Sequence, residues 1–335
     1  MQKIGPKVVA VIPTLGNNES RLTTLVDSIK KYSGAYNLKI VLVDNSVDGI
    51  LSKLDSVDEV IWTGINLGWV GSIEYVRRRQ EFDYLWTVQD DMTLLNDVLG
   101  ILLKEFSGNS SLGVASPVMV RDGLIPARTR GGIFINEEKL EWINIPDVDL
   151  DPKNFEQDVE LCFVSGSGAL WSRQALEEIS GFDLALYPLG LVDVDTCFRL
   201  RALNWKLRLL PAAQITHEGS GSTPSMLGVT LHSINEEIMK NKRLGSENAK
   251  VNYKNDLEYD FLFSIAKKSS FLFLNASNHA KSVFRDLDSQ MVELHEQIAE
   301  LHQQIMKSES KLHNVYNSRT WKLTSLFRFL AKFFT

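Results

Sequence analysis

The sequence predicts an α/β fold built on a mostly parallel sheet whose faces are covered by helices. Two observations lead to this prediction. Short, almost wholly apolar runs alternate with amphipathic segments through the first 120 residues, a pattern typical of strands buried on both faces. Polar side chains also follow directly after several of these runs, and parallel α/β sheets bind ligands at the carboxyl ends of their strands.

The first part of the chain supplies this pattern in order. An apolar run that ends at Pro13 predicts the first strand, and Leu22, Leu25 and Ile29 recur at helical spacing after it. Later runs end at Asp44 or lead into acidic residues. The expected strands are 8–12, 39–43, 59–62 and 84–88, and the expected helices are 21–32 and 72–82.

The next part of the chain is less regular. Residues 121–154 contain Gly131-Gly132 and several prolines, which predicts an irregular insertion or a hairpin. An apolar stretch interrupted by Gly and Ser follows at 161–171. Beyond it we expect helices at 173–179 and 193–203, a strand at 206–210, and mainly helical structure over 225–280.

A heptad pattern marks the C-terminal region. Apolar residues recur there at alternating steps of four and three, with Ser308 as the only break, which predicts a coiled coil of about four heptads. The alternative is a single amphipathic helix that packs on the globular body. The apolar residues of the pattern are Leu287, Met291, Leu294, Ile298, Leu301, Ile305, Leu312 and Val315.

The last segment, 317–335, is basic and rich in aromatic residues. It contains Arg319, Lys322, Arg328 and Lys332 but no acidic residue. Such a segment favours an interfacial helix at an anionic membrane surface. The alternative is that its aromatic side chains pack on the coiled coil or on a partner.

Composition limits the class of protein. The chain has 335 residues, with 36 Lys and Arg against 42 Asp and Glu, a net charge of −6. Mild acidity argues against nucleic acid as the main partner. Cys162 and Cys197 are too few for a disulfide framework and fit no metal-ligand spacing. With no signal peptide and no apolar run of membrane-spanning length, we expect a cytoplasmic protein.

Four polar clusters follow predicted strands or lie just beyond them. The paired carboxylates Asp90 and Asp91 repel each other, which favours a bound cation there. The imidazole of His217 would complete a mixed oxygen and nitrogen set suited to Mn²⁺ or Mg²⁺, and Asp193 could act as a general base toward a hydroxyl. A cation site combined with a carboxylate base suits the transfer of a group from an activated nucleotide. The clusters are Pro13–Asn17, Asp44–Ser46, Gln89–Met92, and Val192–Asp195 with His217–Gly221.

The same motifs, in this order, resemble glycosyltransferase family 2, whose members are inverting enzymes of GT-A fold with nucleotide-sugar donors. The resemblance covers about residues 8–260, and the rhamnosyltransferase-like and galactofuranosyltransferase-like bacterial branches look nearest. The motifs that carry it are Val11–Thr14, Val43–Ser46, Asn66–Gly71, Gln89–Asp91, Ser165–Gly168 with Gly181–Asp183, Asp193–Asp195 with Arg199, His217–Gly219 and Tyr253–Asn255.

The resemblance implies a nucleotide pocket at the ends of the first strands. Pro13, Thr14 and Asp44 would line it, with Asp44 at the base edge or the ribose. Asn66 and Gly71 would lie near the diphosphate.

It also implies the reacting groups. Gln89, Asp90 and Asp91 match the three positions of the family's D-x-D motif, of which the last binds the metal. His217 matches the histidine that completes the metal site in some members. Asp193 matches the catalytic base.

Trp171 and Arg130 are weaker candidates for the acceptor or donor pocket. Separately, Trp69, Trp171 and Trp205 are better interpreted as core or wall residues than as recognition surfaces. Two positions depart from the family pattern. Gln89 stands where the first acid of D-x-D is expected, and Val192 where an acid usually precedes the catalytic Asp.

Together these observations predict an enzyme that moves a sugar, with inversion, from a UDP- or dTDP-sugar to a hydroxyl of a glycan or lipid-linked glycan acceptor. It would use Mg²⁺ or Mn²⁺ and serve polysaccharide biosynthesis for the cell envelope. The enzyme would form a homo-oligomer through its coiled coil and be peripheral on the inner face of the plasma membrane. The expected regions are a GT-A domain over 1–225, a helical region packed on it over 226–283, a coiled coil over 284–316 and an amphipathic tail over 317–335.

Two other interpretations stay open. A nucleotidyltransferase would need a glycine-rich phosphate loop with a basic residue after the first strand, which 15–18 does not supply. A weakly active or non-catalytic GT-A homologue, acting as a coiled-coil scaffold in glycan assembly, is compatible with Gln89 and Val192.

Overall fold

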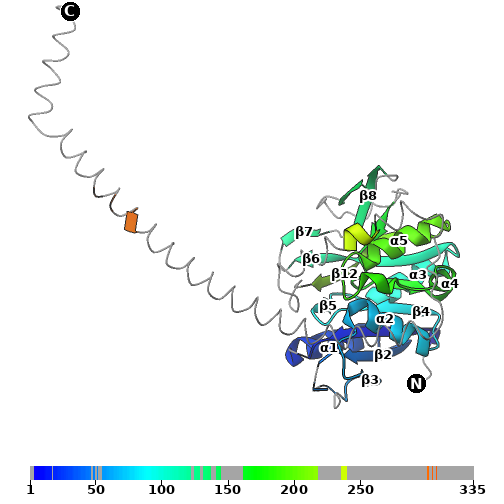
Figure 1. The fold of residues 1–335 in the computed structure, drawn as a ribbon. Coiled ribbons are helices and arrows are strands. Elements are labelled where there is room, and N and C mark those ends of the chain that lie inside the picture. The colour runs from blue at the N-terminus through cyan, green and yellow to red at the C-terminus, as the bar shows by residue number, and fades with distance from the viewer. Residues whose placement is uncertain are drawn as a thin grey trace, which may run out of the picture. The chain divides into compact units, whose positions relative to one another are not determined.

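The computed structural model divides into two compact units, Met1–Leu274 and Asn275–Thr335. The described part of the first unit is a mixed α/β body (Figure 1). The residues that the structure describes are 4–16, 18–46, 48–49, 51, 55–121, 124–128, 131–136, 141–144, 161–217, 235–239, 300–301, 304 and 307.

The body is built on one curled, mostly parallel sheet. Its strands lie in the order β3-β2-β1-β4-β11-β6-β12-β5, and β7 pairs with β6 off this path. Pairs β1·β2, β1·β4, β2·β3 and β6·β12 are parallel, whereas β11 runs antiparallel between β4 and β6. The strands are β1 (Ile4–Thr14), β2 (Tyr36–Asp44), β3 (Glu59–Trp62), β4 (Tyr84–Thr87), β5 (Met92–Leu94), β6 (Leu112–Arg121), β7 (Leu124–Arg128), β11 (Leu170–Ser172) and β12 (Lys206–His217).

Helices cover both faces of this sheet, as the sequence predicts. Alternation along β1 sends Val8, Ala10 and Ile12 to one core cluster and Val9 and Val11 to the other. The first cluster includes the apolar faces of α1 (Glu19–Ser33) and α3 (Val98–Ser107). The second includes those of α2 (Gly68–Arg79), α4 (Arg173–Glu178) and α5 (Val192–Ala202), with the short 3₁₀ helix η2 (Leu184–Leu186).

A second, three-stranded sheet accounts for part of the expected insertion. It has the order β10-β8-β9, and its members are β8 (Gly131–Asn136), β9 (Glu141–Asn144) and β10 (Phe163–Val164). β8 and β9 form an antiparallel pair, so the hairpin predicted within 121–154 is confirmed.

Most predicted elements are found within a few residues of their expected bounds, but β12 is longer than expected. Proline at position 211 predicts an end near Leu210. The strand instead shifts register between Leu210 and Gln214 and continues to His217. This bulge accommodates Pro211 and carries the strand to the polar edge of the sheet.

Little of the C-terminal region is described. Residues 235–239 are helical, as are Glu300, Leu301, Gln304 and Lys307. The remainder of the expected helical region, coiled coil and tail lies outside the described residues. Among the described residues, no helix combines the length and hydropathy needed to cross a membrane.

Candidate active site at the carboxyl ends of the strands

The polar clusters predicted to share one edge of the sheet do meet there. Thr14 at the end of β1 is in register with Asp44 at the end of β2. The chain after β4 stays beside β1, because Val88 donates its N–H to the carbonyl of Val11 at 3.0 Å. His217 at the end of β12 pairs with Met92, which directly follows the acidic residues.

Asp44 organises the loop after β2. Its two carboxylate oxygens accept the backbone N–H groups of Ser46 at 2.8 Å and Leu51 at 3.1 Å. The residue is fully buried. The carboxylate therefore joins Ser46 and Leu51 to the end of β2 at the rim of the site.

The start of α2 is tied to the same rim. Asn45 accepts the N–H of Leu67 at 2.9 Å, and Asn66 accepts that of Gly68 at 2.7 Å. Gly68 has φ +64° and lies against Pro188, whose carbonyl oxygen would be 2.5 Å from an added Cβ, so only glycine fits there. Gly71 is buried in the first turns of α2, and Pro13 is half-buried at the end of β1.

Asp90, Asp91, Gln89 and His217 form the acidic part of the site. Asp90 accepts a hydrogen bond of 2.6 Å from the Thr14 hydroxyl. Nε2 of His217 lies 3.1 Å from Oδ1 of Asp91, and their side chains are only 5% and 9% exposed. The same nitrogen contacts the amide oxygen of Gln89.

The pKa values of the neighbouring carboxyl groups of Asp90 and Asp91 are shifted in opposite directions. Burial raises the pKa of Asp90 above its usual value, an effect that the Thr14 hydrogen bond opposes and the charge of Asp91 reinforces. Burial also acts to raise the pKa of Asp91, but the hydrogen bond and charge of His217 outweigh it, and the net pKa is lowered. Asp91 is thus the carboxylate held in its ionised form.

The geometry around His217 fits a small divalent cation. Two adjacent ligands of an octahedral Mg²⁺ lie about 2.9 Å apart, close to the 3.1 Å between Nε2 of His217 and Oδ1 of Asp91. The amide oxygen of Gln89 adds a neutral donor. Among the described residues no group of three or more His, Cys, Asp or Glu side chains gathers in a metal-binding arrangement, so the protein would supply a sparse ligand set.

Asp193 lies in the first turn of α5, where the helix dipole favours a negative charge. Its oxygens accept the N–H groups of Gly166 at 2.8 Å and Val194 at 3.0 Å. A Cβ on Gly166 would lie 3.0 Å from the Trp69 ring and 3.2 Å from Cβ of Asp193. Glycine at 166 therefore allows the Trp69 ring and Asp193 to lie close to the backbone at this position. The hydroxyl of Thr87, at the end of β4, donates a hydrogen bond to the carbonyl of Gly166.

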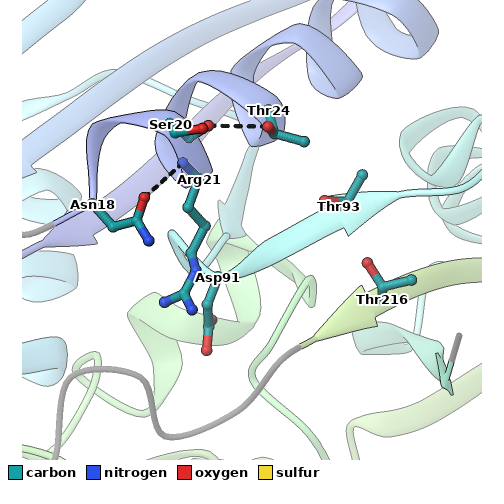
Figure 2. A pocket seen from close by; sticks show the side chains of 7 residues that line it. All are labelled: Asn18, Ser20, Arg21, Thr24, Asp91, Thr93 and Thr216. Carbon is teal, nitrogen blue, oxygen red and sulfur yellow. Dashed lines mark hydrogen bonds between the residues drawn. The ribbon is translucent and has the colours of Figure 1, made fainter.

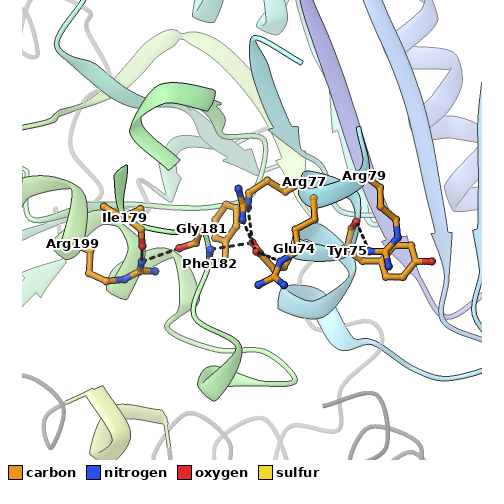
Figure 3. A network of polar contacts seen from close by, with 9 residues as sticks. Glu74, Tyr75, Arg77, Arg79, Ile179, Gly181, Phe182 and Arg199 are labelled. Atoms are coloured by element: carbon orange, nitrogen blue, oxygen red, sulfur yellow. Dashed lines mark hydrogen bonds and ion pairs between the residues drawn. The ribbon is translucent and has the colours of Figure 1, made fainter. Parts of the chain in front are cut away.

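A buried ionic network lies behind this edge (Figure 3). Arg199 of α5 pairs with Asp195 at 2.7 Å and donates to the carbonyls of Ile179 and Gly181 at 2.9 and 2.8 Å. Glu74 of α2 accepts the N–H of Phe182 at 3.2 Å. The network thus holds the 179–182 turn between α2 and α5.

Glu74 was missed by sequence reasoning. It is fully buried and accepts hydrogen bonds of 2.7 Å from Arg77 and Arg78. The available signal was a glutamate on the apolar side of α2, followed by arginines three and four residues later.

Trp69, Trp171 and Trp205 lie in the core or pack against it. Trp171 is fully buried, donates to the Thr87 hydroxyl at 3.0 Å and packs edge-on against Phe182, so its assignment to a ligand pocket is wrong and its core role is confirmed. Trp205 is also buried. Trp69 is half-buried and packs on the same Phe182 ring. Arg130 lies outside the described residues.

This chain is similar to a known protein family in sequence and to a solved structure in fold. The family model described as glycosyl transferase family 2 matches residues 9–180. A search of curated proteins finds no match.

Three solved structures are similar to this chain at low identity, and the first of them, with a TM-score above 0.5, has the same fold. GalNAc-T7 with UDP, GalNAc and Mn²⁺ is 15% identical with a TM-score of 0.53, over 67% of this chain and 46% of that one. This chain therefore spans about half the length of that protein. A mannosyltransferase from Pyrobaculum calidifontis in complex with GDP-Man and Mn²⁺ is 18% identical with a TM-score of 0.47, over 65% and 58% of the two chains. TarS of S. aureus is 15% identical with a TM-score of 0.43, over 62% and 36%.

Proposed function

The chain belongs to glycosyl transferase family 2, and from this premise we propose that it is an inverting glycosyltransferase of GT-A fold. It would move a sugar from a nucleotide-diphosphate sugar to a hydroxyl of a glycan or lipid-linked glycan acceptor. One observation carries the proposal. The Asp91–His217 pair and the carboxylate of Asp193 lie on segments that meet at the same carboxyl edge of the sheet.

Asp193 is the proposed general base. Its carboxylate takes the proton of the acceptor hydroxyl, whose oxygen forms a bond to the anomeric carbon while the bond from that carbon to the diphosphate breaks. The backbone N–H groups of Gly166 and Val194 hold the carboxylate in place. Attack from the face opposite the leaving group inverts the anomeric centre.

Asp91 and His217, with the amide oxygen of Gln89, are the residues proposed to hold Mg²⁺ or Mn²⁺. When bound, the ion neutralises charge on the diphosphate leaving group. Two of the structural neighbours contain Mn²⁺ with a nucleotide or nucleotide sugar, which supports this class of cofactor. Asp90, held by Thr14, keeps the acidic turn in position.

The nucleotide is proposed to bind along the ends of β1 and β2 and the start of α2. A UDP- or dTDP-sugar is our proposed donor. The residues proposed to border it are Pro13, Thr14, Asp44, Asn66, Gly71, Gln89 and Asp90.

The C-terminal region is proposed to place the enzyme near its acceptor. A coiled coil over 284–316 would form a homo-oligomer, and the basic tail over 317–335 would bind the inner face of the plasma membrane, where polysaccharides of the cell envelope are assembled. Deletion of 317–335 should abolish co-sedimentation with anionic vesicles. Unchanged membrane partitioning would contradict the role of the tail.

The function is tested by screening nucleotide sugars for release of the nucleoside diphosphate. One donor should be consumed in the presence of Mn²⁺ and spared after chelation. If no donor is consumed and no nucleoside diphosphate binds, the proposal fails.

A non-catalytic homologue that acts as a coiled-coil scaffold is the second candidate. One observation favours it, because Gln89 contacts the same Nε2 atom of His217 that a metal would need. Binding of Mn²⁺ without turnover of any donor would support this alternative.

A further inference from the structure

A polar cavity lies beside the proposed metal site (Figure 2). It opens between the N-terminal turns of α1 and the antiparallel pair of β5 and β12, with a volume of about 240 Å³. Asp91 is one of its walls, and Thr216, the residue before His217, is another. The cavity is thus continuous with the acidic part of the site, and Asp91 is the only one of its lining residues to which the family motifs give a role.

The residues that line this cavity are all of polar types. Besides Asp91 it presents the guanidinium of Arg21 and four hydroxyl groups, with no apolar side chain among the lining residues. The hydroxyl of Thr24 already donates to the carbonyl of Ser20 at 3.0 Å, so three of the hydroxyl groups remain as possible donors to a ligand. The hydroxyl groups belong to Ser20, Thr24, Thr93 and Thr216. Such a surface suits a small, highly hydrated ligand that accepts and exchanges hydrogen bonds.

Arg21 is the feature of this cavity that favours an anion. The side chain of Arg21 extends from α1 toward Asp91 (Figure 2), and its positive charge acts on the carboxyl groups of both Asp90 and Asp91. The start of α1 adds the positive end of a helix of 15 residues. With a divalent cation held by Asp91 and His217, the cavity would be bordered by positive charge on two sides.

We propose that this cavity is a phosphate-binding subsite in which Arg21 is the fixed cation. Arginine presents a planar set of donors that matches phosphate oxygens, and the hydroxyl groups of Ser20, Thr93 and Thr216 can donate to the remaining oxygens. The inference rests on the proposed function for its context, since the phosphate would belong to the nucleotide-sugar donor or to a phosphate-linked acceptor. Gln89 gives the acidic turn one negative charge fewer than the family motif would. A fixed arginine beside this turn would supply positive charge to the phosphate, and phosphate binding would then depend less on the metal.

The test compares wild type, Arg21→Gln and the matched control Lys30→Gln, which removes an exposed cation from the same helix. Binding of inorganic pyrophosphate is measured by calorimetry with and without Mn²⁺. Loss of a charge-assisted contact should weaken pyrophosphate binding by about 10-fold to 100-fold in Arg21→Gln, and the ratio should be larger without Mn²⁺. Thermal unfolding verifies that both variants fold.

Two further arms identify the source of the phosphate. If it is the donor's, Arg21→Gln weakens UDP or dTDP binding by the same ratio but leaves binding of the nucleoside unchanged. If it is the acceptor's, nucleotide binding is unchanged and the KM for a polyprenyl-phosphate-linked acceptor rises. The inference is overturned if wild type and Arg21→Gln bind pyrophosphate equally well. It is also overturned if neither protein binds pyrophosphate. Pyrophosphate binding that depends on Arg21, without turnover of any nucleotide sugar, would instead overturn only the proposed function.

Discussion

Two groups of acidic side chains in this protein differ in how fully their oxygens are occupied. Behind the sheet edge, each carboxylate oxygen of Glu74 accepts two hydrogen bonds, from Arg77, Arg78 and the backbone of Phe182. At the edge, the only side chain found to bond Asp91 among the described residues is His217, and Asp193 is held by backbone N–H groups while it stays partly exposed.

This difference distinguishes carboxylates that stabilise the fold from carboxylates that can take part in a reaction. A buried carboxylate whose oxygens are all occupied has no electron pair left for a substrate, and removing its partners leaves an uncompensated charge. A carboxylate fixed by backbone groups but open to solvent can still accept a proton or bind a cation. We therefore assign Glu74 to the framework and Asp193 to the reaction. Asp195 joins the framework because it is buried against Arg199 at 2.7 Å, and Asp91 joins the reaction because its partner at 3.1 Å is the candidate metal ligand His217.

The strongest way to break this comparison is Asp193→Asn. Loss of a general base should lower kcat by about 10²-fold to 10⁴-fold, with little change in donor affinity or thermal stability. Steady-state kinetics and calorimetry measure both. The matched variant Asp195→Asn should instead lose stability, because it leaves Arg199 buried without its carboxylate. Equal kcat in wild type and Asp193→Asn would remove the proposed base.

Glu74→Ala tests the framework side. Because the side chain of Glu74 is fully buried and paired, its loss should lower the free energy of unfolding by about 3–5 kcal/mol. Glu177→Ala is the control, since its pair with Arg173 is exposed and should contribute less than about 1 kcal/mol. Urea unfolding compares the two variants, and similar small losses would refute the framework role.

Asp91→Asn sharpens the assignment at the edge. The variant retains the size of the side chain but loses the charge, so Mn²⁺ affinity should fall by at least about 10-fold. The exposed Asp27 of α1 provides a control, Asp27→Asn, that should bind Mn²⁺ as wild type does. Mn²⁺ binding followed by electron paramagnetic resonance gives both values. Undiminished affinity in Asp91→Asn would place the metal elsewhere.

The smallest expected effect is that of Thr14→Val on Asp90. The Thr14 hydroxyl opposes the rise in the pKa of Asp90 that burial causes, so the variant should raise that pKa further. A carboxyl group whose pKa is raised on folding adds stability below its unfolded pKa, and this is lost as pH rises through the folded value. Thr14→Val should therefore cost about 1 kcal/mol at neutral pH and less in acid. Carboxyl NMR titration measures the shift, and an unchanged pKa would exclude the hydrogen bond.

Much of the fold was predictable from sequence because its signals are local. The apolar run of β1 and the helical spacing of α1 each lie within a dozen or so consecutive residues. The central strand β6 was not predicted, since Leu112–Arg121 contains a proline and a glycine that weaken the strand pattern. Its strand character comes from pairing with β11 and β12, which lie far along the chain.

The candidate site was predictable where it follows strand ends and not where it depends on packing. Asp91 and His217 were predicted as a pair, and the structure brings them to 3.1 Å. Gly166 as the contact of Asp193, Glu74 as a buried anchor and Arg21 beside the acidic turn depend on contacts between distant segments. The spacing of residues along the chain does not predict such contacts.

The central claim, that Asp193 activates the acceptor for a single displacement, is tested most directly by the anomeric configuration of the first-formed product. Proton NMR of a reaction with a donor of known configuration gives it from the anomeric coupling constant. We expect inversion relative to the donor. A product that retains the donor's configuration would contradict it.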